Sequence, residues 1–187
     1  MDKSKLKIIS NRPALGYEQV AEVLFNCATL LQMSGANPYR IAHYRQAALT
    51  FLTKGSPALD MALDEEKWPE LGLGKRLGGK IRELVRDGTM GFYIELRADL
   101  PPAVDSLMNI HGIGPVLAIR LHKELGVRSP AELADAARRG EVIKLPGFGL
   151  KRQTAYARIL GPTPPTIPAS AALRLIRNDS EALPVAA

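Results

Sequence analysis

Cysteine is almost absent from this sequence: the 187 residues contain a single one, Cys27. One cysteine excludes an internal disulfide, and there is no CxxC pair, so we expect a protein of a reducing compartment. Valine and leucine residues surround Cys27 in the sequence, which favours a buried apolar thiol over a nucleophile. The few histidines, His43, His111 and His122, are scattered along the chain, and we expect no transition-metal site.

Long hydrophobic runs are also missing. The N-terminal stretch is rich in lysine, but no apolar segment long enough for a signal peptide or a membrane span follows it. We therefore expect a cytoplasmic protein with no membrane contact. No stretch alternates between apolar and polar residues with a period of two, so we also expect no sheet.

Apolar residues instead recur at helical spacing. The pattern predicts a first helix over residues 17–34 and a second over residues 38–53, which begins at Asn37-Pro38. Ser56-Pro57 and Ser129-Pro130 are typical of further helix starts. Glycines that are typical of helix ends stand at Gly35, Gly88, Gly126 and Gly140.

Positive charge is in excess. Lysine and arginine outnumber aspartate and glutamate 25 to 19, which gives a net charge of +6 and a pI near 9.6. A basic balance of this size is the first property expected of a protein that binds nucleic acid. Many basic proteins bind none, so the charge alone shifts the interpretation only slightly.

Three turns of the form glycine–hydrophobic–glycine repeat along the chain. Their first glycines lie 40 and 35 residues apart, as expected for repeated supersecondary units. Each turn is predicted to join a short helix to a second, amphipathic helix, which makes it a helix-hairpin-helix motif. One such turn would be unremarkable, but three are hard to dismiss. The turns are Gly72-Leu73-Gly74, Gly112-Ile113-Gly114 and Gly147-Phe148-Gly149.

These turns suit the binding of phosphate. Glycine tolerates unusual backbone angles and lets backbone N–H groups approach an anion closely. The helix that begins at each turn adds unpaired N–H groups and the positive end of its dipole. Contacts of this kind touch phosphates and leave base edges unread, so we expect DNA binding that is independent of sequence and sensitive to salt. Lys75, Arg76, Lys80, Lys151 and Arg152 would be backbone contacts.

The three motifs are unequal in their apolar framing. In the second and third, hydrophobic residues stand two and five positions before the first glycine, and both look like plain backbone grips. In the first motif those positions hold Glu70 and Lys67, and the apolar pair is shifted to Leu71 and Trp68. We therefore expect a distorted leading helix there, with Trp68 as a cap over the helix pair.

The sequence divides into four predicted parts. Residues 1–16 form a basic arm that we expect to be flexible, and residues 161–187 form a Pro/Ala-rich tail in which residues 171–177 are predicted to make one or two helical turns. Residues 17–99 hold a helical subdomain with the first motif, and residues 100–160 hold the second and third motifs. The predicted fold class is all-α, a helical bundle followed by tandem helix-hairpin-helix motifs in two closely packed subdomains.

The stretch Asn37-Pro-Tyr-Arg-Ile-Ala-His-Tyr44-Arg-Gln-Ala-Ala48, the three turns and Leu145-Pro-Gly-Phe-Gly149 together resemble a known family. These motifs are similar to those of the N-terminal lyase and helix-hairpin-helix regions of family-X, polymerase-beta-type DNA polymerases, above all the bacterial and archaeal members. The resemblance covers about residues 20–160. The polymerase palm and the phosphoesterase domain have no counterpart here, so we expect no polymerase activity from this chain alone.

The resemblance implies a pocket for a 5′-phosphate. The phosphate-gripping positions of the family fall on Arg40 and Arg76, a pocket tyrosine falls on Tyr44, and an aromatic or histidine position falls on Tyr39. The family's lyase nucleophile, which forms a Schiff base with an abasic sugar, falls on Lys80. Arg76 and Lys80 are one helical turn apart and are expected to face the same side. The full set predicted to contact DNA or a 5′-phosphate is Tyr39, Arg40, Tyr44, Arg45, Lys75, Arg76 and Lys80.

Departures from the family pattern weaken the case for lyase chemistry. Gly79 stands where the family has a glutamate beside its nucleophile, and Phe92 stands at a basic position. Gly78 and Gly79 also soften the helix that presents Lys80, because each glycine costs about 1 kcal/mol relative to alanine. The alternative is that Lys80 is a solvated lysine or one that contacts phosphate. Neither of these roles requires the glutamate or the basic residue that the family has.

Three functions stay open at this stage. The first is a cytoplasmic, nucleoid-associated module for DNA repair that binds gapped, nicked or abasic DNA and works with a polymerase, nuclease or ligase supplied in trans. The second is a stand-alone 5′-deoxyribose-phosphate or abasic-site lyase that uses Lys80. The third is a protein-interaction scaffold. We expect no cofactor, although the resemblance implies that the hairpin carbonyls could hold Na⁺ or K⁺; the oligomeric state is open.

Overall fold

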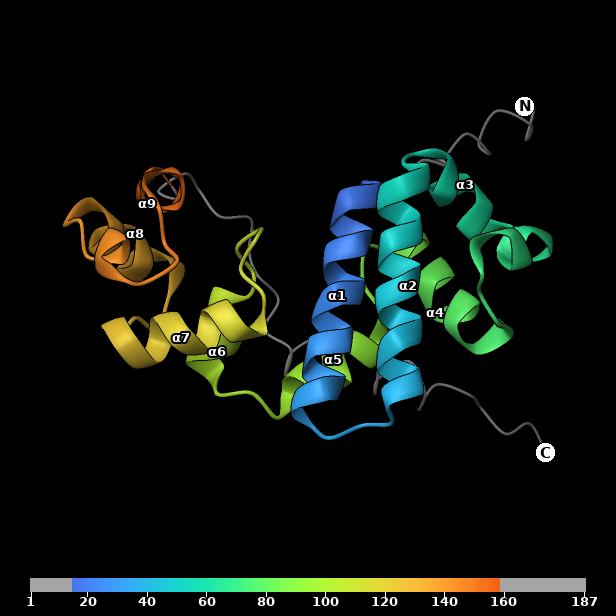
Figure 1. Cartoon of the computed structure of the whole chain (residues 1–187), viewed down its shortest axis with the longest axis horizontal. Coiled ribbons are helices and arrows are strands. Elements are labelled where there is room, and N and C mark those ends of the chain that lie inside the picture. The colour runs from blue at the N-terminus through green and yellow to red at the C-terminus, as the bar shows by residue number, and fades with distance from the viewer. Residues whose placement is uncertain (1–14, 159–187) are drawn as a thin grey trace, which may run out of the picture. The chain divides into compact units, whose positions relative to one another are not determined.

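The computed structural model describes residues 15–158 of the chain, and within them every regular element is helical (Figure 1). This confirms the all-α prediction. The chain divides into two compact units between Tyr93 and Ile94. The expectations for most of the arm and for residues 161–187, including the helical turns at 171–177, lie outside the described residues.

The N-terminal unit is built on a pair of antiparallel helices, α1 (Tyr17–Met33) and α2 (Pro38–Lys54), which lie side by side in Figure 1. Two short elements follow, α3 (Pro57–Leu63) and the 3₁₀ helix η2 (Glu65–Leu71). Helix α4 (Lys75–Asp87) then packs on α3, η2 and α1.

Helix starts and stops follow the predicted residues. The side chain of Asn37 accepts a hydrogen bond of 2.9 Å from the backbone N–H of Tyr39, and Pro38 occupies the first helical position of α2. Gly88 and Gly126 end their helices in the left-handed conformation that glycine adopts without a steric penalty. The local chemistry of the chain therefore sets the element boundaries.

The core of the N-terminal unit lies where α1, α2 and α4 meet. Its largest fully buried side chains include Leu24, Phe51, Ile81 and Leu84. Burial of side chains of this size contributes about 1.5–3 kcal/mol each, and this packing fixes α4 relative to α1 and α2.

Trp68 closes the first helix pair, as predicted. Its side chain is 3% exposed, and its indole N–H donates to the carbonyl of Ala62 at 2.9 Å. A Cβ atom at Gly78 would lie 2.4 Å from the indole ring, so α4 packs on Trp68 at a distance that only glycine permits. The predicted distortion of the leading helix is confirmed, because η2 is a 3₁₀ helix with Pro69 inside it.

The C-terminal unit begins within α5 (Gly91–Ala98) and holds the second and third motifs. Helices α6 (Pro102–Leu107) and α7 (Pro115–Leu125) form the second motif. Helix α8 (Pro130–Arg138), the 3₁₀ helix η3 (Val142–Lys144) and α9 (Leu150–Ala157) follow and pack together. A 3₁₀ leading element is therefore common to the first and third motifs, whereas the sequence pointed to irregularity only in the first.

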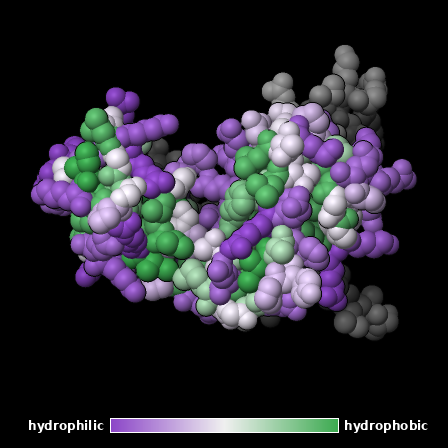
Figure 2. Space-filling model, in the orientation of Figure 1, coloured by the Kyte–Doolittle hydropathy of each residue, from purple (hydrophilic) through white to green (hydrophobic). Residues whose placement is uncertain are grey.

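Apolar side chains on the surface are interspersed with polar ones. On the face drawn in Figure 2, hydrophobic residues gather in several patches with hydrophilic residues between them. The exposed large apolar and aromatic residues of α1 and α2 are Met33, Tyr39, Leu49 and Leu52. Between residues 15 and 158, no helix combines the length and the apolar character needed to cross a bilayer.

Candidate functional site

The three glycine–hydrophobic–glycine turns share one backbone conformation. The first glycine of each turn has a φ between 68° and 82°, a region that strains any residue with a Cβ. The second glycine is extended and serves as the N-cap of the following helix. The central residues anchor the turns, because Leu73, Ile113 and Phe148 are 6%, 0% and 5% exposed.

Each turn presents the N-terminus of a helix. Within residues 15–158, no side chain caps α4, α7 or α9 at its first residue, because the cap is glycine in all three. Their first backbone N–H groups therefore depend on water or on a ligand for hydrogen bonds. A phosphate oxygen is a suitable acceptor for such groups.

The three turns differ more clearly in the charge of the residues that follow them than in the apolar residues that precede them. Helix α4 begins with Lys75-Arg76, and α9 has Lys151-Arg152 in its first turn. Helix α7 begins instead with Pro115, which has no N–H, and Val116, whose side chain is 60% exposed. The first and third turns are therefore cationic, and the second is not.

The third turn gathers two arginines from different helices. The guanidinium carbons of Arg120 on α7 and Arg152 on α9 lie 5.3 Å and 5.6 Å from the centre of the Phe148 ring. Arg152 also donates to the carbonyl of Gly147 at 3.2 Å. Sequence reasoning missed Arg120, because its place beside the turn depends on how α7 packs in the folded unit.

A cavity of about 730 Å³ lies between α2 and α4 in the N-terminal unit; we call it the cation pocket. It brings together five of the seven residues that the sequence assigned to DNA or 5′-phosphate contact. None of the residues that line it is acidic. The lining residues are Asn37, Tyr39, Arg40, His43, Tyr44, Arg76, Leu77 and Lys80.

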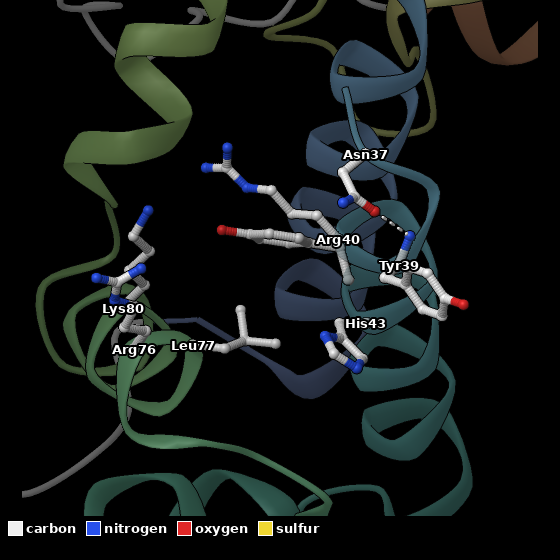
Figure 3. Close-up of a pocket in the computed structure, with 8 residues that line it drawn as sticks. Asn37, Tyr39, Arg40, His43, Arg76, Leu77 and Lys80 are labelled. Carbon is white, nitrogen blue, oxygen red and sulfur yellow. Dashed lines mark hydrogen bonds between the residues drawn. The ribbon is translucent and has the colours of Figure 1, made fainter. Parts of the chain in front are cut away.

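Three cations approach the pocket from facing helices. Figure 3 shows Arg40 extending from α2 toward Arg76 and Lys80 on α4, while the ring of Tyr39 points away from them. Tyr39 is 79% exposed and forms part of the rim. Within the described part of the chain, neither Arg40 nor Arg76 is paired with a carboxylate. Such an array attracts an anion.

An aromatic ring lies behind these cations. The Lys80 Nζ atom lies 3.4 Å from the centre of the Phe92 ring, and the Arg40 guanidinium carbon lies 4.6 Å from it. Phe92 also stacks on Tyr44, with ring centres 5.7 Å apart. Burial, followed by the nearby Cys27 thiol, raises the pKa of the Tyr44 hydroxyl far above its usual value, so this group stays protonated as a hydrogen-bond donor.

Two predicted contact residues lie elsewhere. Arg45 faces away from the cation pocket and donates a hydrogen bond to the side chain of Gln32. Lys75 is exposed at the start of α4, beside the first turn. Conversely, Asn37 and Leu77 line the pocket although the sequence gave neither a binding role, and the exposed side chain of His43 is also part of the lining.

Histidine outside the cation pocket makes a contact within the fold, and no cluster of potential metal ligands is found among the described residues. The His122 Nδ1 atom lies 2.9 Å from the carbonyl oxygen of Val127. Among residues 15–158, no three histidine, cysteine, aspartate or glutamate side chains are placed to hold a metal ion together.

Cys27 is expected to be inert toward thiol reagents in the folded protein. Its side chain is fully buried on α1, and burial raises the pKa of its thiol from 9 to about 12. Ellman's reagent at pH 8 should therefore react far more slowly with the native protein than with the urea-unfolded chain. Equal rates in the two states would contradict the buried position.

The turns and the helices that follow them have the form of helix-hairpin-helix motifs. Residues 104–153 match the family model described as a SAM-like helix-hairpin-helix tandem. The chain is 26% identical over 169 residues to the DNA polymerase/3′-5′ exonuclease PolX of Bacillus subtilis (strain 168), an alignment that covers 89% of this chain. These matches confirm the resemblance to the helix-hairpin-helix region of family-X polymerases.

A second relative shares the motif in a different setting. The chain is 36% identical over 88 residues to the Holliday junction branch migration complex subunit RuvA of Solibacter usitatus (strain Ellin6076), an alignment that covers 46% of this chain. The chain spans only 29% of the length of PolX and 42% of the length of RuvA.

Proposed function

We propose that this protein binds DNA through the phosphate backbone without reading its sequence, and that the cation pocket receives the 5′-phosphate at a gap, nick or other break. The observation that carries the proposal is the convergence of Arg40, Arg76 and Lys80 in one cavity with no acidic lining residue. The similarity to a DNA polymerase and to a Holliday junction protein supports DNA as the partner. Repair of broken DNA is the process that such a module serves.

The chemistry of the pocket suits a terminal phosphate. A phosphate monoester carries about −1.5 to −2 charges at pH 7, more than a diester within a continuous strand. Arg40 and Arg76 offer planar forks that bind phosphate oxygens in pairs, and the Tyr44 hydroxyl adds a neutral donor. The first turn lies at the start of α4, the helix that carries Arg76. The same helix would therefore contact both the phosphate backbone of the DNA and its 5′-phosphate end.

The preference for a 5′-phosphate is the measurable consequence. We expect gapped DNA with a 5′-phosphate to bind at least ten-fold more tightly than the same DNA with a 5′-hydroxyl, measured by fluorescence anisotropy. A hydrogen bond to a charged group contributes about 1.5–3 kcal/mol, so Arg40→Ala or Arg76→Ala should remove most of this ratio.

Lys54→Ala is the matched control, because Lys54 is exposed at the far end of α2, about 20 Å along the helix from Arg40. It should leave the ratio intact. Equal affinity of the wild-type protein for the two ends would rule out the phosphate site.

A second candidate function is lyase activity at an abasic 5′ end. Lys80 favours it, because it lies inside the pocket one helical turn from Arg76. The reaction would need the neutral amine to attack C1′ of the sugar with loss of water, and a base to remove a proton before elimination. Borohydride trapping tests it: the expected sign of lyase activity is a covalent adduct that Lys80→Ala abolishes.

A further inference from the structure

Phe92 occupies a position from which it touches several groups of the cation pocket at once. Its ring contacts the Lys80 ammonium, the Arg40 guanidinium and the Tyr44 ring, although Phe92 itself is not among the lining residues. These three partners come from two different helices, α2 and α4, while Phe92 is on α5. One ring therefore contacts residues from both of the helices that form the pocket.

The face of an aromatic ring attracts a cation and offers no comparable attraction to a neutral amine. At 3.4 Å, Lys80 lies well within the range of this interaction, which extends to about 6 Å. Lysine otherwise carries a long stem with much rotational freedom, and that freedom is lost whenever the side chain binds a ligand. A ring that holds the ammonium in place before the ligand arrives reduces this loss.

We infer that Phe92 is a positioning residue of the cation pocket: its ring holds Lys80 and Arg40 as fixed cations, and so makes Lys80 a ligand of the bound phosphate. This inference rests on the proposed function and deepens it, because it assigns Lys80 to binding. An amine nucleophile must give up its proton and move onto a sugar carbon. The ring face favours the opposite state, charged and held in place.

The contact between Phe92 and Lys80 can be tested without any ligand. An aromatic ring shifts the NMR resonances of atoms above its face to lower frequency. The Lys80 ε-methylene resonance, assigned by its loss in Lys80→Arg, should show this shift in the wild-type protein and lose it in Phe92→Leu. A Lys80 resonance at the position of exposed lysines in the wild type would overturn the inference.

The functional role is tested on the two gapped DNAs. Phe92→Leu should reduce the preference for the 5′-phosphate about three- to ten-fold, whereas Phe92→Tyr, which keeps the ring face, should retain it. In a double-mutant cycle, Phe92→Leu should have a much smaller effect when Lys80 is already methionine, because the two residues then share one interaction. Circular dichroism melting shows whether each variant is folded.

The outcomes separate the inference from the proposed function. If the wild-type protein does not distinguish the two DNA ends, the proposed phosphate site fails, while the NMR shift still reports on the ring contact. If the wild type distinguishes them and Phe92→Leu does so equally well, the positioning role is wrong. A borohydride adduct on Lys80 of the wild type would overturn the assignment of Lys80 as a ligand.

Discussion

Gly78→Ala is expected to destabilise the protein, although alanine is the best helix former and Gly78 lies inside α4. An added Cβ atom would lie 2.4 Å from the Trp68 indole. That ring cannot move away easily, because it is buried and its N–H is bonded to the carbonyl of Ala62. Overpacking of this kind costs about 1–3 kcal/mol, which over most of that range outweighs the gain of about 1 kcal/mol in helix propensity. Urea unfolding measures the change.

Gly79→Ala is the matched control, one residue further along the same helix. Apart from its two chain neighbours and the backbone of its own helix, nothing lies within 4 Å of a Cβ atom placed there. Alanine at this position should therefore stabilise the protein by up to about 1 kcal/mol. If the two alanine variants have the same free energy of unfolding, the close packing of Trp68 on α4 is incorrect.

The contrast between these glycines marks a limit of sequence reasoning. Helical periodicity, proline at helix starts and glycine at helix ends were enough to predict the all-α fold and most boundaries, because these effects depend on residues a few positions apart. From the sequence, Gly78 and Gly79 looked like one flexible pair. Only the packing of Trp68 on α4 makes the first of them a structural requirement.

In the candidate site, too, contacts between residues close in the sequence could be predicted, whereas contacts that depend on packing could not. Arg40 and Tyr44 are one turn apart on α2, as are Arg76 and Lys80 on α4, so their shared faces could be predicted. Arg45 is five residues beyond Arg40, about 140° around the helix, and it faces Gln32 instead of the pocket.

Phe92 is the residue that the sequence could identify only as a departure from a pattern. Its contacts with Lys80 and Arg40 depend on how α5 packs against two other helices, and no spacing along the chain encodes that arrangement. Phe92 therefore supplies an aromatic contact to two cations at a position where the resemblance implied a basic residue.

Charge reversal at the third turn is expected to weaken DNA binding more than any single change in the cation pocket. Lys151 and Arg152 are exposed in the first turn of α9, beside Gly147 and the Phe148 ring. The double variant Lys151→Glu/Arg152→Glu removes two cations and adds two anions next to the predicted phosphate contacts. We expect at least a hundred-fold loss of affinity for duplex DNA at low salt, since each of the two charged contacts contributes about 1.5–3 kcal/mol.

The dependence of that affinity on salt distinguishes lost contacts from a general charge effect. Each lost phosphate contact lowers the slope of log K against log salt concentration by about one, so the slope should fall by about two. Lys123→Glu/Arg128→Glu is the matched control, because it makes the same change of net charge at exposed residues outside the three turns. If both variants lose affinity and slope equally, DNA responds to the overall charge of the protein and the third turn has no special role. If only the Lys151/Arg152 variant loses slope, the phosphates are bound at the turn.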